Sequence, residues 1–316
     1  MNAKTSNPQT LRVATYNIHK GVVNDFFGLR RNSRIYDLRA RLHELDADLI
    51  FLQEVQGRND RHTNGLANWP AEPQAQFLAK LPRQSKAAHN PIAVAYENVY
   101  GQNANYLHGH HGNALLSRFP VLRNENRDVS DHALEKRGIL HCVVALDKKP
   151  VHCFVVHFGL LARSRRRQTE ALMAWIKKSV PAEEALIIAG DFNDWRNVLS
   201  DTLCHELNMV EVIDASKDAK RPNVAAARDV AHGAAQKMVY FMHGKLTDLG
   251  MKVAKEKMRI PRTVKAARTF PALVPWLQMD RIYVRGLKVT EAKVLRGPEW
   301  SRLSDHSPLI ADLVLE

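Results

Sequence analysis

The stretch "IIAGDFNDW", residues 187–195, joins an apolar run to a polar turn. Apolar residues lead into Gly190, and Asp191 and Asn193 then stand two positions apart. A short apolar run that ends at Gly and Asp is a common signal for a strand entering a turn. Most Asp-x-Asn pairs form turns in which the side chains bond the local backbone. Whether these two residues carry chemistry therefore depends on the rest of the chain.

Outward from this strand, the chain alternates between apolar runs and helical periodicity. Residues 33–45 and 162–180 have apolar residues at helical spacing. The predicted strands are 11–18, 47–55, 92–96, 113–117, 138–146, 151–158, 185–193, 278–286, 287–295 and 307–315. The link Lys148-Lys149-Pro150 predicts a hairpin between two of them. Hairpins mixed with strand–helix–strand crossovers indicate an α/β architecture of mixed sheets covered by helices.

The bulk composition predicts a protein that buries a large core in one domain. The chain has 316 residues, of which 45% are hydrophobic, and it lacks the roughly 18 apolar residues in a row that a membrane span needs. Its first ten residues have no apolar core of a signal peptide, and three cysteines argue against a disulfide framework. We expect a cytoplasmic protein with a flexible N-terminus (1–10), a single domain (11–316) and a helical insertion at about 215–270.

The expected insertion is strongly basic. Residues 217–268 contain 13 Lys and Arg but only 4 Asp and Glu, which accounts for most of the net charge of +13. Such a surplus favours a polyanionic partner, either nucleic acid or an anionic membrane surface to which the protein binds peripherally. A solvated face that covers ordinary core remains an alternative.

Polar residues recur where the predicted strands end. They are Asn17, Glu54, His157, Asp191, Asn193, Asp280, Asp305 and His306. Each alone is explained by a turn or a cap, but packing does not require such a series. In open α/β sheets, ligand sites gather at one edge of the strands. The series therefore predicts a functional site at the edge of a sheet.

The residue types in this series suit the hydrolysis of a phosphate ester. Glu54 and Asp305 offer hard oxygen ligands suited to Mg²⁺, Mn²⁺ or Ca²⁺. Asp191 is a candidate base for water, and His306 with Asp280 forms a candidate His–carboxylate pair. The chain has neither a nucleophile elbow nor a glycine-rich phosphate loop. We therefore predict metal-assisted attack of water on a phosphoryl group, with His157 as a hydrogen-bond donor to a phosphoryl oxygen.

Seven motifs in order resemble the endonuclease/exonuclease/phosphatase superfamily, the deoxyribonuclease-like hydrolases, and a bacterial branch near its sphingomyelinase-like group. The motifs are "TYNIHKG", "LQEV", "GNALLSRFP", "VVHFGL", "GDFNDW", "MDRIYV" and "LSDHSPL". The resemblance implies a four-layer α/β sandwich, in which two mixed β-sheets pack face to face with helices outside.

The resemblance also implies a role for each matching residue. Glu54, Asn17 and Asp305 form the metal site for Mg²⁺, or for Mn²⁺ or Ca²⁺. Asp191, His306, His157 and Asp280 are implied to be catalytic, and Asn193, Asn113 and Arg137 to bind substrate. Some branches carry a second acid two positions after the first asparagine, where this chain has His19. The histidines of "HGHHGN" (108–113) are expected to form a polar surface loop, with an extra metal site as the alternative.

Several functions fit this pattern. The first is a Mg²⁺-dependent phosphodiesterase that acts on nucleic acid or on a phospholipid headgroup. A phosphomonoesterase that acts on a small phosphorylated substrate would use the same residues in a tighter pocket. A non-catalytic module that binds anionic lipid or nucleic acid is the third alternative, although the complete residue set argues against it.

Overall fold

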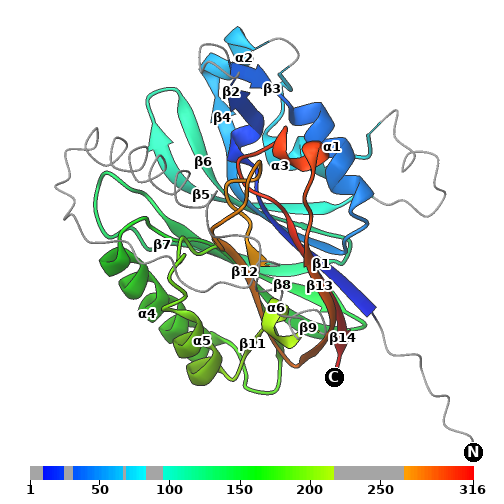
Figure 1. Cartoon of the computed structure of the whole chain (residues 1–316), viewed down its shortest axis with the longest axis vertical. Coiled ribbons are helices and arrows are strands. Elements are labelled where there is room, and N and C mark those ends of the chain that lie inside the picture. The colour runs from blue at the N-terminus through cyan, green and yellow to red at the C-terminus, as the bar shows by residue number, and fades with distance from the viewer. Residues whose placement is uncertain (1–9, 25–30, 67–68, 83–94, 217–266) are drawn as a thin grey trace, which may run out of the picture.

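Two six-stranded mixed sheets pack face to face (Figure 1). The computed structural model describes residues 10–24, 31–66, 69–82, 95–216 and 267–316. The first sheet has the order β13 (Leu287–Val294), β14 (Leu309–Leu315), β1 (Thr10–Asn17), β4 (Leu49–Asn59), β6 (Gly109–Ser117) and β5 (Glu97–Tyr106). The second has the order β11 (Val210–Glu211), β12 (Asp280–Arg285), β10 (Ala185–Asp191), β9 (Lys149–His157), β8 (Gly138–Leu146) and β7 (Val121–Asp128).

Helices pack around this sandwich. They are α1 (Ile35–Glu44), α2 (Asp60–Gly65), α3 (Gln74–Ala79), α4 (Ala162–Ser179), α5 (Ser200–Leu207), α6 (Val212–Ala215) and α8 (Pro298–Ser301). A short 3₁₀ turn (His19–Gly21) and the ribbon β2 (Val22–Asn24) and β3 (Arg31–Ser33) follow β1. Helices α4 and α5 cover the second sheet, whereas α1 and α3 cover the first (Figure 1). The predicted four-layer sandwich is confirmed.

Each sheet contains a single parallel pair of strands among otherwise antiparallel neighbours. Strand β1 runs parallel to β4, and β9 runs parallel to β10. A parallel pair needs a crossover connection, and α1 and α4 lie in the two crossovers. The carboxyl ends of each pair consequently emerge at one edge of their sheet.

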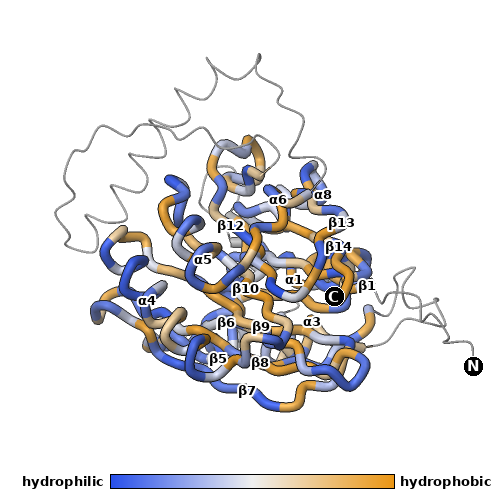
Figure 2. The backbone as a smooth tube through the Cα atoms, turned by 90° about the horizontal axis from the view of Figure 1, so that it is seen from below, coloured by the Kyte–Doolittle hydropathy of each residue, from blue (hydrophilic) through white to orange (hydrophobic). Residues whose placement is uncertain are grey.

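Three apolar layers hold the sandwich together. The layer between the sheets includes Val13, Phe51 and Ile187, all with no exposed surface. The two outer layers join each sheet to its helices, and Leu172 of α4 and Leu38 of α1 are fully buried there. Figure 2 shows these apolar stretches in orange, running through the interior of the molecule. The helical spacing seen in the sequence places these side chains on one face.

The structure also contains strands that the sequence did not predict. Strands β5 and β7 are long but polar, and most of their residues are exposed or half-buried because both strands lie at sheet edges. The predicted strand 92–96 falls largely outside the described residues, as do the expected helices and most of the basic surplus of the 215–270 insertion. In the part of the chain that is described, no helix combines the length and apolar character needed to cross a membrane.

Candidate active site at the shared edge of the two sheets

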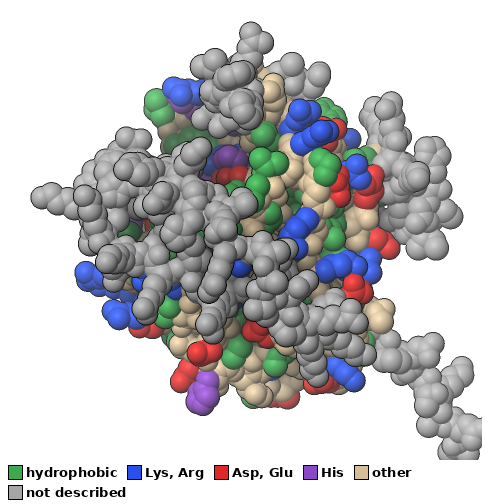
Figure 3. Space-filling model, viewed as in Figure 1, with side chains coloured by type: hydrophobic (Ala, Val, Ile, Leu, Met, Phe, Trp, Pro, Cys, Tyr) green, Lys and Arg blue, Asp and Glu red, His purple; other side chains and the backbone are tan. Residues whose placement is uncertain are grey.

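The polar residues predicted at strand ends meet at one edge of the sandwich. Asn17 ends β1, His157 ends β9 and Asp191 ends β10. Asp280 opens the antiparallel strand β12 directly opposite Asp191, so it reaches the same edge. Figure 3 shows histidine and acidic side chains close together near the centre of the face in view. The topology thus assembles a site from segments that are far apart in sequence.

Asp191 occupies the centre of this site with 2% of its surface exposed. Its Oδ1 accepts a hydrogen bond from the backbone N–H of Asn193 at 2.9 Å. Its Oδ2 accepts one from Asn17 Nδ2 at 3.1 Å and lies 3.6 Å from His157 Nε2 and 3.7 Å from His306 Nε2. The motif therefore forms the ordinary Asx turn with one oxygen and presents the other to three nitrogens.

Burial perturbs the acid–base properties of Asp191. Removal from water, with some help from the Asp280 charge, raises the pKa of Asp191 to about 7, although His306 opposes the rise. A carboxylate with this pKa accepts protons efficiently near neutral pH. Its contacts of 3.6 and 3.7 Å with the histidines are longer than hydrogen bonds, and contacts of this length are commonly bridged by water.

His306 and Asp280 form the His–carboxylate pair that the sequence predicted to be close. His306 Nδ1 lies 2.8 Å from Asp280 Oδ2, and neither residue is appreciably exposed. Burial alone would lower the pKa of His306, but the carboxylates of Asp280 and Asp191 raise it to about 10. At neutral pH His306 is therefore an imidazolium, oriented by Asp280 with Nε2 facing Asp191. Phe270 packs against this ring, with 4.8 Å between centroids.

His157 is also buried, but unlike His306 it is neutral. Burial, and next the charge of Arg137, hold the pKa of His157 well below its ordinary value. Its imidazole is neutral at pH 7 and can donate through only one ring nitrogen. The two histidines on either side of Asp191 thus differ, one being cationic and one neutral.

Glu54 fits a metal ligand. It lies at a bulge in β4, between Leu52 and Val55, with a left-handed φ of 55°. Its Oε2 is buried without a hydrogen-bond partner among the described residues, while Lys20 Nζ lies 2.9 Å away as an ion pair. Burial opposes ionisation, but Lys20 and the nearby histidines keep the pKa of Glu54 well below its usual range. An ionised carboxylate with unused lone pairs suits a hard divalent cation.

Asn17 and Asp305 lie beside the turn that follows β1. Asn17 Oδ1 accepts from the backbone N–H of His19, and the Asp305 side chain is 45% exposed with Oδ1 3.6 Å from His19 Nδ1. Ser304 Oγ donates to the Asn17 carbonyl at 2.7 Å and so fastens the segment carrying Asp305 to the end of β1. The oxygen donors of Glu54, Asn17 and Asp305 therefore suit Mg²⁺ or Mn²⁺.

A second group of potential ligands is Asp191, Asp280 and His306, whose ligand atoms lie within 4.8 Å of one another. A histidine must be neutral to bind a metal. His306 is instead cationic and already bonded through Nδ1. The Glu54 position is chemically the better candidate for a metal.

Asn113 and Arg137 are held by other groups of the protein. Asn113 Nδ2 donates to the carbonyls of Gly138 and Val155, which links the two sheets, and its Oδ1 is buried without a partner among the described residues. The Arg137 guanidinium donates to Glu135 Oε1 and the Phe158 carbonyl. Asn193 Nδ2 likewise donates to the Phe158 carbonyl, at 2.9 Å. These contacts use donors that the sequence analysis assigned to substrate.

Two further residues near Glu54 were not predicted there, namely Lys20 and His111. His111 is not in a surface loop but on β6, and burial followed by the charge of Lys20 lowers its pKa to about 4. The surface-loop prediction was wrong because residues 109–117 pair with both β4 and β5. Lys20 stood in the quoted motif "TYNIHKG", and its position three residues after Asn17 was the available signal.

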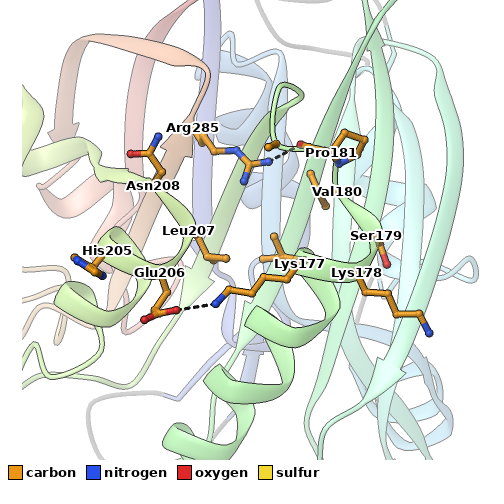
Figure 4. A pocket seen from close by; sticks show the side chains of 12 residues that line it. Lys177, Lys178, Ser179, Val180, Pro181, His205, Glu206, Leu207, Asn208 and Arg285 are labelled. Carbon is orange, nitrogen blue, oxygen red and sulfur yellow. Dashed lines mark hydrogen bonds and ion pairs between the residues drawn. The ribbon is translucent and has the colours of Figure 1, made fainter.

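A cavity lies away from this site (Figure 4). It measures about 640 Å³ and is lined by residues near the ends of α4 and α5, including Lys177, Glu206 and Arg285. Arg285 pairs with Leu186 near the start of β10, whereas Asp191 ends that strand. The cavity therefore opens at the opposite edge of the sheet from Asp191.

Comparisons with known proteins show the family of the chain. The model of the Endonuclease/Exonuclease/phosphatase family matches residues 14–306. The chain is 33% identical over 308 residues to the "Uncharacterized protein YbhP" of Escherichia coli (strain K12), with 97% of each chain covered.

Solved structures show the same fold. The endonuclease/exonuclease/phosphatase from Bacteroides vulgatus aligns with a TM-score of 0.61 and 19% identity, over 98% of this chain and 100% of that chain. The human Nocturnin catalytic domain with bound sulfate anion aligns with a TM-score of 0.58 and 17% identity, over 98% and 94% of the two chains. Since the family model spans nearly the whole sequence, the chain belongs to the endonuclease/exonuclease/phosphatase family, whose members are typically metal-dependent hydrolases of phosphoester bonds.

Proposed function

We propose that this protein is a Mg²⁺-dependent phosphodiesterase. The observation that carries the proposal is the position of Asp191 Oδ2 among Asn17, His157 and His306. A base with a pKa of about 7, a cation and a neutral donor face one small volume. This combination suits the activation of water beside a phosphoryl group.

Each residue then has a separate task. Asp191 orients the water and accepts its proton, while the imidazolium of His306 stabilises negative charge on a phosphoryl oxygen. His157 donates a hydrogen bond to a second oxygen, and Asn193 fixes the turn that carries Asp191. A divalent cation held by Glu54, Asn17 and Asp305 would supply Lewis-acid polarisation of the phosphoryl group.

The charge of the site favours a diester over a monoester. A phosphomonoester carries close to two negative charges at neutral pH, whereas a diester carries one. The Arg137 guanidinium, which the sequence analysis assigned to the phosphate, is paired with Glu135 at 2.9 Å. Less positive charge is therefore free for a dianion.

The substrate class belongs to the proposal as well. We propose nucleic acid or a phospholipid headgroup, since the basic segment 217–268 would supply counter-charge for either partner. A location in the cytoplasm or at the membrane surface is consistent with this partner. Deletion of 217–268 should weaken binding to DNA or to anionic vesicles while hydrolysis of a small soluble diester persists. Equal loss on every substrate would make the segment structural.

The test is a parallel hydrolysis assay with Mg²⁺ and with EDTA. The substrates are plasmid DNA, RNA, phospholipid vesicles, bis(p-nitrophenyl) phosphate and p-nitrophenyl phosphate. Asp191→Asn should reduce metal-dependent hydrolysis by at least ~100-fold, whereas Asp201→Asn, an exposed carboxylate on α5, should have no effect. Hydrolysis of only the monoester would favour the phosphomonoesterase, and no Mg²⁺-dependent hydrolysis would favour the non-catalytic module.

A further inference from the structure

Lys20 is held at the site by an unusual backbone turn. His19, Lys20 and Gly21 all have left-handed φ values, of 45°, 61° and 65°. Non-glycine residues adopt this conformation only where the surroundings enforce it, and such residues cluster at functional sites. The turn closes with a hydrogen bond from Gly21 N–H to the Ile18 carbonyl at 2.8 Å. This local backbone strain sets the direction of the Lys20 side chain, which points to Glu54.

Gln74 joins this turn to the strand that carries Glu54. Gln74 is 1% exposed, and its Nε2 donates to the Lys20 carbonyl at 2.6 Å. Its Oε1 accepts from the backbone N–H of Gln56, two residues after Glu54, at 2.7 Å. One buried amide therefore fixes the distance between the Lys20 turn and the bulge of β4.

The two strained segments place opposite charges in contact. Lys20 Nζ lies 2.9 Å from Glu54 Oε2, and the side chains are 33% and 20% exposed. Glu54 itself has a left-handed φ. A single, partly exposed ion pair contributes only modestly to stability, so stability alone does not account for two strained backbone segments. A role of the Lys20 ammonium in the site accounts for these strained segments better.

The residues around Glu54 offer one set of oxygen ligands for a divalent ion. Asn17 and Asp305 lie beside the turn that carries Lys20, with Asn17 Oδ1 3.1 Å from the His19 N–H and Asp305 Oδ1 3.6 Å from His19 Nδ1. Because Lys20 Nζ already lies 2.9 Å from Glu54 Oε2, the ammonium and a divalent ion would share this carboxylate.

We propose that Lys20 is a fixed cation of this site, sharing Glu54 with a single divalent ion and contacting the phosphoryl group of the substrate. The inference deepens the proposed function and rests on it. It makes Lys20 a residue that the reaction uses, because its ammonium lies beside the carboxylate of Glu54. Lys20 opposes metal binding through repulsion, and it favours the phosphate through attraction.

Calorimetric titration of the full chain separates these two effects without measuring catalysis. Lys20→Met keeps the length of the side chain and removes the charge, so Mn²⁺ should bind at least ~10-fold more tightly than to wild type. Inorganic phosphate, titrated with saturating Mg²⁺, should bind at least ~10-fold more weakly. Lys20→Arg should restore both values toward wild type. Lys178→Met, at an exposed lysine near the opposite edge, should change neither.

The outcomes distinguish this inference from the proposed function. One Mn²⁺ per chain, bound more tightly by Lys20→Met with weaker phosphate binding, supports the inference. If Glu54→Gln loses Mn²⁺ binding while Lys20→Met matches wild type for both ligands, the inference is overturned and the proposed metal site stands. If Glu54→Gln binds Mn²⁺ like wild type, the proposed metal site and this inference both fail.

Discussion

Replacement of Asp280 by Asn should return His306 to its neutral form at pH 7. The rise in the pKa of His306 from 6.5 to about 10 corresponds to roughly 5 kcal/mol in favour of the imidazolium. Asp280, 2.8 Å from Nδ1 and fully buried, is the larger of the two carboxylate contributions. The side-chain oxygen of an asparagine can still accept a hydrogen bond from His306 Nδ1–H. The variant therefore removes the charge of Asp280 while it preserves the orientation of the ring.

Two measurements check this prediction. An NMR titration of the imidazole should place the pKa of His306 more than ~3 pH units lower in Asp280→Asn than in wild type, so that the neutral form dominates at pH 7. Metal-dependent diester hydrolysis at pH 7 should fall by ~100-fold or more. Asp201→Asn serves as the matched control on the surface of α5. An imidazolium that persists at pH 8 in the variant, together with at least half of the wild-type rate, would refute the reasoning.

Three further predictions concern stability. Burial, followed by the neighbouring His152, lowers the pKa of His141 to about 3, so the unfolded chain binds the extra proton and stability falls as the pH drops from about 6.5 toward 3. Between pH 7 and 5, the free energy of unfolding measured in urea should fall by about 1 kcal/mol per pH unit less in His141→Phe than in wild type. Equal slopes of this free energy against pH in the two proteins would contradict the prediction. Leu172→Ala should cost about 2–5 kcal/mol at the fully buried face of α4, whereas an unchanged urea midpoint would contradict the predicted packing. Gln74→Leu leaves the Lys20 carbonyl without its donor and should lower the free energy of unfolding by about 1–3 kcal/mol. Calorimetry should also show an altered Mn²⁺ affinity. Wild-type stability together with wild-type affinity would argue against a role of Gln74 in joining the Lys20 turn to β4.

Much of the fold was predictable because its central strands are apolar on both faces. Strands β1, β4, β9 and β10 are buried between a second sheet and a layer of helices, so their sequences read as nearly continuous apolar runs. Where such a run stops, a polar residue is conspicuous. This is why the residues that end β1, β9 and β10 could be identified without coordinates.

The edge strands could not be identified in the same way. β7 has the sequence "VLRNENRD", and only its first residue is as much as half-buried. Backbone pairing with β8 stabilises it, and backbone pairing leaves little trace in the side chains. A similar argument applies to β5, which is polar and forms an edge strand of the first sheet.

Parts of the site were beyond a sequence argument for a different reason. Lys20 reaches Glu54 only because two backbone segments adopt left-handed conformations, and no periodicity signals them. Arg137 is of the right type to bind a phosphate, but Glu135, two residues earlier, competes for its guanidinium. His111 reaches the neighbourhood of Glu54 through the pairing of β6 with β4. Local competition and strand register decide such contacts.

The central claim is that the metal binds at Glu54 and leaves Asp191, Asp280 and His306 free for proton transfer and phosphate binding. The most direct test is an anomalous difference map from crystals of the full chain soaked in Mn²⁺. The account predicts one peak beside Glu54, within coordination distance of its carboxylate, and none between Asp191 and His306. A peak enclosed by Asp191, Asp280 and His306, with none at Glu54, would contradict the account.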